Sequence, residues 1–449
     1  MKHEFFFKLT GDDKIDLVIS LIDSLLTDQL NKILHHPNFL ALEASWRGLS
    51  YLTKCVSKSS LVQLKVISVS WSDLARNFDR CSDVEESALF HKIYNEEFGM
   101  PGGMPFGVML CDFDIHHRTY QDHRIDDVAV VGSMSSVGAA AFVPIIFGAS
   151  PRMFGLDSYE ELERIRNLKQ IFQNNEYQRY QMLRQKEDAR FIGLAMPRIL
   201  MRRPYGPDDS LNLSFRYRED INGLNHQHYC WGSSVYAFGE TLIRAFEQYG
   251  WFANICGFRQ DEISHGLVVG LENYSVETDR PGLVPRISVE TALSSAIENE
   301  LAEAGFIGLG VCKDTDWLVF RNVPSIQRPQ KYDRKAANNN AFISTMLPYI
   351  LCVSRVAHYI KVQIRDTVGA YKTAAEIELK LQNWLYRYST ANDNLPLEMK
   401  ARYPLRASSV QVREVLGKPG TFSCTMHLQP HYRVEQVAAS FKLSMKIIE

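Results

Sequence analysis

Residues 85–113, EESALFHKIYNEEFGMPGGMPFGVMLCDF, contain the alternation of elements that decides the fold class. The spacing of apolar residues over 85–98 predicts a helix. A turn-rich loop at 99–107, with four glycines and two prolines, leads into the apolar run Val108–Phe113, which predicts a buried strand. Helices and short apolar strands alternate in the same way over most of the chain, and this alternation is typical of an α/β protein.

Upstream of this stretch, the sequence predicts two helices and a strand. Apolar residues recur every three or four positions from Lys14 to Leu42, which predicts an amphipathic helix interrupted by Pro37. The helical pattern after the proline continues through Leu52. The run Leu61–Val69 is rich in β-forming and apolar residues, so we expect a strand there.

The polar tract 327–340 ends in three consecutive asparagines and is the strongest candidate for a linker or domain boundary. It separates an N-terminal region, residues 1–326, from a C-terminal region, residues 341–449. We expect more than one structural domain in the first region, because single hydrophobic cores stop growing near ~250–300 residues. In the second region, two long helical patterns precede short alternating strands, which predicts an α+β domain.

The composition predicts a folded protein with a large core. Apolar residues make up 45% of the 449 residues and charged residues 23%, which is incompatible with intrinsic disorder. The net charge of −2 argues against a protein that coats nucleic acid or an anionic membrane by bulk charge. The charge is uneven, however: residues 341–449 hold 14 Lys and Arg against 8 Asp and Glu, whereas residues 1–340 hold 36 against 44.

Several features indicate a cytosolic protein. No stretch reaches the roughly 18–20 consecutive apolar residues that span a bilayer. The start of the sequence lacks the apolar core and the cleavage site of a secretory signal. The eight cysteines are scattered without a CxxC pair, so we expect reduced thiols and neither a disulfide framework nor a zinc ribbon.

The sequence contains no recognisable enzyme motif. No GK[ST] follows the glycine-rich loop at 99–107, and no GxGxxG opens a helix, so neither phosphate-binding motif is met. Paired carboxylates such as Asp112 and Asp114, or Asp126 and Asp127, are more typical of solvated faces and helix caps. We therefore expect no catalytic residue and no cofactor.

Two groups of histidines leave a metalloenzyme as an alternative. His226, His228 and Cys230 would share one face of an extended strand, and the pair at 116–117 lies close to His123. Neither group belongs to an HExxH motif or to a recognisable pattern of two histidines and one carboxylate, so we expect no metal site. Metal analysis of the purified protein distinguishes the two interpretations.

Two basic clusters leave nucleic-acid binding as a second alternative. One includes Arg202 and Arg203, and the other is spaced three and four residues apart between Arg355 and Arg365. The same arginines can pair with acidic neighbours in an assembly. The abundance of Arg, Tyr and Trp favours protein–protein interfaces, where these residues are enriched. A gel shift at moderate salt separates the two interpretations.

Four motifs, spread over most of the chain, point to one family. They are His35-His36-Pro37-x-Phe39-x-x-Leu42-Glu43-x-x-Trp46-Arg47-Gly48, Glu96-Glu97-Phe98-Gly99-x-Pro101-Gly102-Gly103, Pro197-Arg198-x-Leu200-x-Arg202-x-Pro204-Tyr205-Gly206 and Leu347-Pro348-Tyr349-Ile350-Leu351-x-Val353-Ser354-Arg355-x-Ala357-His358-Tyr359-x-Lys361. Together they closely resemble the large subunit of the type VI secretion contractile sheath, the TssC/VipB/EvpB family.

The resemblance implies a phage tail-sheath-like multidomain subunit without a catalytic site. Its C-terminal α+β domain is expected to be similar to a phage baseplate wedge fold. The motif residues to which the resemblance assigns structural roles are Pro37, Glu43, Trp46, Arg47, Gly48, Arg198, Arg202, Pro204, Tyr205, Arg355, His358, Tyr359 and Lys361.

The resemblance also implies partners. Members of the family form a heterodimer with a smaller sheath subunit (TssB/VipA), and the heterodimers stack helically around an inner tube of Hcp hexamers. The sheath is assembled on a baseplate in the bacterial cytoplasm, and its contraction drives the tube and its spike into a target cell. An AAA+ unfoldase (ClpV) then recycles the contracted form.

The end of the chain supplies candidate contact residues for such an assembly. Apolar and polar residues alternate strictly over 441–447, which predicts a strand with one apolar face. The apolar residues of this candidate inter-subunit strand are Phe441, Leu443, Met445 and Ile447. An ordinary strand of its own domain fits the same pattern equally well. The candidate inner-tube contacts are Lys418, Arg433, Lys442 and Lys446.

Overall fold

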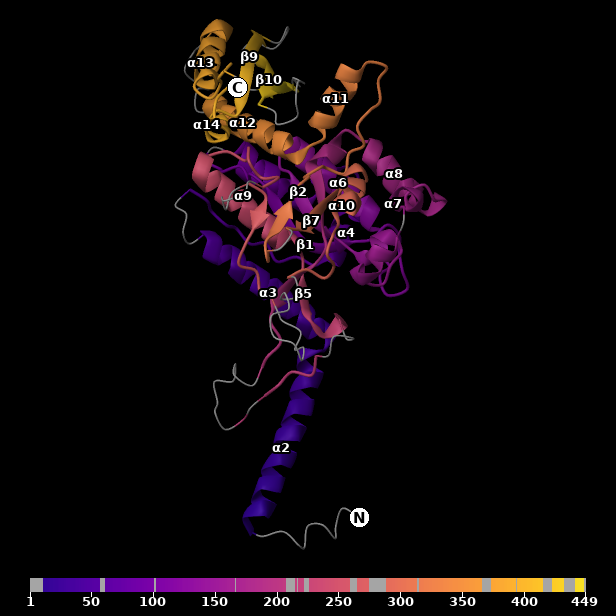
Figure 1. The fold of residues 1–449 in the computed structure, drawn as a ribbon. Coiled ribbons are helices and arrows are strands. Elements are labelled where there is room, and N and C mark those ends of the chain that lie inside the picture. Colours follow the sequence, from indigo (N-terminus) through magenta and orange to yellow (C-terminus); the bar gives the residue numbers. More distant parts are fainter. Residues whose placement is uncertain are drawn as a thin grey trace.

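A computed structural model describes residues 11–56, 61–100, 102–165, 167–206, 215, 217–221, 226–258, 265–273, 288–312, 315–365, 373–392, 394–414, 422–431 and 441–447. Figure 1 shows a body built around a central sheet. The C-terminal helices and a small sheet lie at one end of the body, and helix α2 (Gly11–Leu34) projects from the other.

The central sheet has six strands in the order β1-β2-β3-β7-β8-β6. These are β1 (Met109–Ile115), β2 (Ile145–Ala149), β3 (Ile192–Met196), β7 (Phe306–Val311), β8 (Leu318–Phe320) and β6 (Leu267–Val268). The first four are parallel, whereas β8 and β6 extend the sheet in antiparallel pairing. The predicted combination of helices and short strands is confirmed for the body.

Helices cover both faces of this sheet. The α-helices before residue 335 are α2 (Gly11–Leu34), α3 (Pro37–Val56), α4 (Trp71–Arg80), α5 (Ala88–Phe90), α6 (Asp127–Ala141), α7 (Leu168–Ile171), α8 (Gln178–Gln185), α9 (Val235–Tyr249) and α10 (Ser295–Glu303). The 3-10 helices are η2 (Val84–Glu86), η4 (Pro151–Phe154), η5 (Tyr159–Arg164), η6 (Asn175–Tyr177), η7 (Asp188–Phe191) and η9 (His226–His228), and η3 (His91–Gly99) is a π-helix. A separate antiparallel pair joins β4 (Ile199–Arg202) to β5 (Cys230–Gly232).

Strand β2 shows that the two faces of the central sheet contribute to two separate hydrophobic cores. Its five residues are all buried, and consecutive residues of a strand point to opposite faces. Ile145 and Phe147 belong to the core shared with α4, α6, α8 and α10. Ile146 belongs to the second core, which contains α3 and α9. A strand buried on both faces explains why the sequence here is continuously apolar.

Two local predictions differ from the structure. The helix predicted over 85–98 forms as three consecutive pieces, η2, α5 and η3, because Ser87 restarts the helical path by accepting a hydrogen bond from the amide of Phe90 at 3.2 Å. The strand predicted at Leu61–Val69 is wrong: the segment belongs to no strand of the described chain. Leu61 and Val66 are 61% and 64% exposed, whereas Val62 and Leu64 are partly buried against the second core.

A glycine sets the distance between α3 and α9. A Cβ atom added to Gly48 would lie 2.4 Å from Cε2 of Tyr236, so only glycine permits this contact. The close approach lets the Tyr236 hydroxyl of α9 donate a hydrogen bond to Oδ2 of Asp112 in β1, at 2.8 Å. This packing gives the motif glycine at position 48 a physical reason.

The C-terminal region has its own core and its own sheet. Helices α12 (Leu347–Arg365), α13 (Ala374–Tyr386) and α14 (Leu397–Arg402) accompany β9 (Leu405–Glu414), β10 (Phe422–Pro430) and β11 (Phe441–Ile447). The antiparallel sheet has the order β11-β10-β9. Buried residues of α12, α13, β9 and β10 form a third core.

The two edges of this small sheet differ. Helix α13 covers the outer edge of β9, where Gln382 Oε1 accepts from the amide of Val410 at 2.8 Å and Glu378 Oε2 accepts from the amide of Val412 at 2.9 Å. The strand order places β11 at the opposite edge. Side chains therefore satisfy the backbone of one edge, which is a common way to block pairing with another strand.

Helix α12 joins the body to the C-terminal region. Leu347, Ile350 and Leu351 in its first turns belong to the second core of the body, whereas Val356 and Ile360 belong to the third core. The polar tract predicted as a linker is partly regular, because helix α11 (Lys335–Ser344) begins inside it. The connection between the two regions is thus largely helical.

Candidate assembly surfaces

The most unusual surface of the molecule is helix α2. At 1.5 Å per residue its 24 residues extend about 36 Å, and most of this length stands clear of the body in Figure 1. Its apolar residues remain exposed, for example Ile15 at 58% and Leu25 at 60%. The stripe, which has the three- and four-residue spacing of one helical face, consists of Ile15, Val18, Ile19, Ile22, Leu25 and Leu26.

Only the C-terminal end of α2 is attached to the rest of the described chain by side-chain hydrogen bonds. Asn31 Oδ1 accepts from the Tyr217 hydroxyl at 2.6 Å and from the amide of Asp220 at 3.3 Å. One turn later, His35 Nε2 lies 3.2 Å from Glu219 Oε1 and the His35 ring stacks on His228, with centroids 4.2 Å apart. These contacts fix the direction in which the helix leaves the body.

Beneath this attachment lies a buried ion network centred on Arg202, at the end of β4. Its guanidinium donates to both carboxylate oxygens of Glu219, at 2.6 and 3.0 Å, and to Glu43 Oε1 of α3 at 2.8 Å. Arg47 donates to the same Glu43 oxygen at 2.7 Å. Arg202 also lies over the ring of Tyr205, 4.3 Å from its centroid. Four predicted structural residues thus meet in one cluster.

Glu219 completes this cluster, and the sequence analysis missed it. It lies in a polar loop without a recognisable motif, yet its side chain is fully buried. Burial alone would raise its pKa, but the hydrogen bonds and charge of Arg202 lower it on balance. The only sequence signal was indirect: an arginine at the end of an apolar strand requires an acidic partner if it is buried.

The other residues of the first motif define an exposed face of α3. Pro37 occupies the first position of the helix, where a missing amide proton is tolerated. Leu42 and Trp46 are 57% and 65% exposed, and Phe39 is 37% exposed on the same side. Pro204 lies between Arg202 and Tyr205 in the irregular segment that follows β4.

Arg198 forms a second ion pair, with the buried Glu290. It donates to both oxygens of Glu290, at 2.7 and 3.0 Å, and so joins the start of β4 to the segment around residue 290. Nearby, burial raises the pKa of Asp114 to about 6, although the charge of Arg198 opposes this shift. Glu290, like Glu219, was not anticipated from the sequence.

The fourth motif attaches α12 to the body. Burial lowers the pKa of His358 to about 4, so its ring is neutral at pH 7 and Nε2 donates to the carbonyl of Ala141 at 3.0 Å. The Arg355 guanidinium lies 4.4 Å from the ring centroid of Tyr359, and Lys361 Nζ lies 5.4 Å from that of Phe98. These residues have packing roles.

The surface residues predicted near the C-terminus are only partly described. Strand β11 contains Phe441, Leu443, Met445, Ile447, Lys442 and Lys446, and it pairs antiparallel with β10 over residues 441–447. Lys418 and Arg433 lie outside the described residues. The strand is therefore regular and located at an edge, and its role between subunits stays a prediction.

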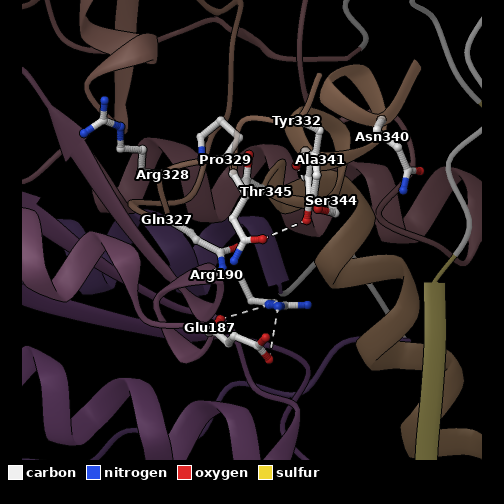
Figure 2. Close-up of a pocket in the computed structure, with 12 residues that line it drawn as sticks. Glu187, Arg190, Gln327, Arg328, Pro329, Tyr332, Asn340, Ala341, Ser344 and Thr345 are labelled. Carbon is white, nitrogen blue, oxygen red and sulfur yellow. Dashed lines mark hydrogen bonds and ion pairs between the residues drawn. The ribbon is translucent and has the colours of Figure 1, made fainter. Parts of the chain in front are cut away.

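Two surface pockets of the described chain are candidates for ligand binding. One has a volume of about 250 Å³ and lies between helix α11 and the segment 327–332; Figure 2 shows Arg190 and Glu187 on its wall, joined to each other. The other, of about 530 Å³, is lined by aromatic residues of α9, α12 and α13. Neither lining presents an arrangement of nucleophile, base and oxyanion donors.

Two of the groups raised as alternatives receive little support: the basic residues at 202–203 and the candidate metal ligands at 226–230. Arg202 is buried in its ion network and Arg203 pairs with Glu272 at 3.2 Å, so this cluster is not a free basic surface. Cys230 is buried, and burial raises the pKa of its thiol to about 12, which disfavours a thiolate ligand. His228 stacks on His35. The side chain of His226 lies outside the described residues.

In the part of the chain that the structure describes, no helix is long and apolar enough to cross a membrane.

We expect Arg202→Met to destabilise the chain by about 3–5 kcal/mol at pH 7, because it leaves the buried Glu219 carboxylate without its cation. Arg203→Met is the matched control: this side chain is 59% exposed, and its removal should change the free energy of unfolding by less than about 0.5 kcal/mol. Urea unfolding of both variants measures the difference, and equal effects would contradict the proposed importance of the network.

The same network predicts a pH dependence. Because the folded chain lowers the pKa of Glu219, the associated stability is present above the unfolded pKa near 4.5 and is lost as the pH falls through the folded value. Without Arg202, burial should instead favour the protonated Glu219. The difference in unfolding free energy between wild type and Arg202→Met should therefore shrink between pH 7 and pH 4.

Comparisons with known proteins agree with these features. Residues 16–327 match the family model VipB, "EvpB/VC_A0108, tail sheath N-terminal domain", and residues 336–447 match VipB_2, "EvpB/VC_A0108, tail sheath gpW/gp25-like domain". The chain is also 36% identical over 436 residues to the type VI secretion system sheath protein TssC1 of Pseudomonas aeruginosa, covering 96% of this chain and 86% of that protein. The chain belongs to the TssC/VipB/EvpB family, the large subunits of the type VI secretion contractile sheath.

Proposed function

We propose that this chain pairs with the small sheath subunit (TssB/VipA) and that the pair polymerises helically around the Hcp inner tube. The observation that carries the proposal is the apolar stripe of α2, exposed along a helix that projects from the body. The proposed protein is a structural subunit and not an enzyme. It acts in the cytoplasm, on a baseplate at the inner membrane.

The free energy gained by burying exposed apolar surface favours a protein partner. Burying apolar surface contributes roughly 25 cal/mol per Å², and contacts within the described chain leave most of this stripe uncovered. A projecting helix of this kind is typical of helix-in-groove or helix-pair recognition. The exposed face of α3, with Leu42 and Trp46, enlarges the apolar surface available to the same partner.

Further association is proposed to use the C-terminal sheet. Its β11 edge is the one that α13 does not cover, and an uncovered edge can pair with a strand from a neighbouring subunit. We place this exchange in the C-terminal domain, which we expect to be similar to a phage baseplate wedge fold. Such tethers would keep subunits connected while the bodies move as rigid units during contraction.

Contraction is proposed to drive the tube and its spike into a target cell, after which an AAA+ unfoldase (ClpV) recycles the subunits. The excess of basic residues in 341–449 supports a polar contact with the inner tube, for which we retain Lys418, Arg433, Lys442 and Lys446. A polar contact can form and release as the sheath changes diameter, whereas a large apolar one would resist release.

The pairing surface is tested by Ile22→Glu/Leu25→Glu. Two carboxylates on the apolar stripe should weaken co-purification with the small sheath subunit by at least about 100-fold, because a buried unpaired charge is strongly unfavourable. The matched control, Ser20→Glu/Ser24→Glu, adds the same charges on the opposite side of α2 and should leave pairing intact. Equal yields of complex from both double variants would contradict this assignment of the surface.

The edge strand is tested by deleting residues 440–449. The heterodimer should stay soluble, but long sheaths should disappear from electron micrographs because the proposed tether is gone. Thermal unfolding of the deleted heterodimer provides the control for loss of β11 from its own sheet. Sheaths of normal length after the deletion would rule out this tether.

The tube contact is tested by Lys442→Glu/Lys446→Glu. Reversing two charges should weaken co-sedimentation of sheath with Hcp and reduce its dependence on salt, since electrostatic attraction is screened by ions. The control is Lys331→Glu/Lys335→Glu, which reverses two exposed lysines outside both α2 and the C-terminal strands. Unchanged co-sedimentation at all salt concentrations counts against the contact.

A further inference from the structure

Three side chains that share no sequence motif converge at the carboxyl end of β1. His116 follows the strand directly, His123 lies in the loop after it, and Asp127 is the first residue of α6. His116 Nδ1 lies 2.9 Å from Asp127 Oδ2, and His123 Nε2 lies 2.6 Å from Asp127 Oδ1. The two imidazole rings stack with centroids 4.5 Å apart. Possible ligand atoms of all three residues lie within 4.8 Å of one another.

Asp127 is held in a fixed orientation. Its side chain is 1% exposed, and Trp71 Nε1 donates to Oδ1 at 2.6 Å while the amide of His116 donates to Oδ2 at 2.9 Å. These donors leave each carboxylate oxygen directed toward one imidazole. Hydrogen bonds that orient a ligating carboxylate in this way are characteristic of metal sites.

The loop that carries the histidines is anchored by residues outside the trio. Tyr120 and His123 exchange backbone hydrogen bonds, at 2.7 and 3.2 Å. Arg152 holds Asp122 through two hydrogen bonds, of 2.8 and 2.7 Å, and lies over the Tyr120 ring. The imidazoles are thus positioned before any ion arrives, which reduces the ordering cost of binding.

We propose that His116, His123 and Asp127 form a binding site for a divalent transition-metal ion of the Zn²⁺ class. Two imidazoles and one carboxylate are a donor set that suits Zn²⁺, Co²⁺ and Ni²⁺, and disfavours Mg²⁺ and Ca²⁺, which prefer oxygen. The lone pairs of Nδ1 and Nε2 become available when each ring carries its proton on the other nitrogen. The sequence showed only that His116 and His123 lie near each other in the chain, and the turn at 120–123 brings them together with Asp127.

The site has room for an ion with modest movement. Metal–ligand distances near 2.0–2.1 Å require donor separations of roughly 3.3 Å in a tetrahedral site. The two imidazole–carboxylate separations, 2.9 and 2.6 Å, would therefore have to lengthen by about 0.4 and 0.7 Å. His116 and His123 keep 14% and 24% of their side chains exposed, so movement and access of water are possible. Water would complete the coordination. The ion would join the loop after β1 to the first turn of α6.

The test uses the full-length chain without a histidine tag, freed of metal with EDTA. Co²⁺ should bind at one equivalent with visible d–d absorption, and Zn²⁺ should displace it. His123→Gln should weaken binding by at least about 100-fold, and Trp71→Phe, which removes an orienting donor, by about 10–100-fold. His91→Gln is the matched control, because His91 is 65% exposed and lies outside the trio.

Far-UV circular dichroism establishes that each variant is folded, and Asp127→Asn serves as a second ligand variant. Absence of saturable Co²⁺ binding to the wild type would overturn the proposal and leave a hydrogen-bonded cluster. Indistinguishable titrations of His123→Gln and His91→Gln would overturn it as well. The readout is independent of sheath assembly, so the proposed function does not influence the outcome.

Discussion

The guanidinium of Arg202 is the point on which the arrangement of the N-terminal half depends. It joins β4, the first turns of α3 and the loop that carries Glu219, and Glu43 of α3 alone lies 159 residues before Arg202 in the chain. Desolvating a charge is unfavourable unless partners occupy its donors, so these segments have to meet in one geometry. Since His35 contacts the same Glu219, the direction of α2 is set by this network as well.

The sheet and the helix α12 extend this constraint through the rest of the molecule. Both faces of the parallel strands are covered, and α12 begins in one of the two resulting cores and ends in the core of the C-terminal region. His358 adds a buried hydrogen bond to the end of α6. The body and the C-terminal region thus share a continuous helix.

Much of this architecture could be predicted from the sequence, for identifiable reasons. Periodicity located α3 and the alternating strand β11, because packing against one face imposes the same spacing on the residues that form it. The strand expected at Leu61–Val69 was wrong because strand formation needs a partner, which the local sequence does not reveal. Glu219 escaped notice, and Asp127 was interpreted only as a solvated or capping carboxylate, for a related reason: their importance comes from residues that are distant in the chain or brought close by a turn.

The coverage of β9 by α13 has a consequence for how many neighbours the small sheet can accept. Gln382 and Glu378 occupy backbone donors along that edge, and the Glu378 carboxylate also repels the carbonyl oxygens of an approaching strand. Any added strand would therefore have to pair on the β11 side. A sheet that can accept a strand at one edge only takes one such neighbour, so strand pairing through it cannot branch.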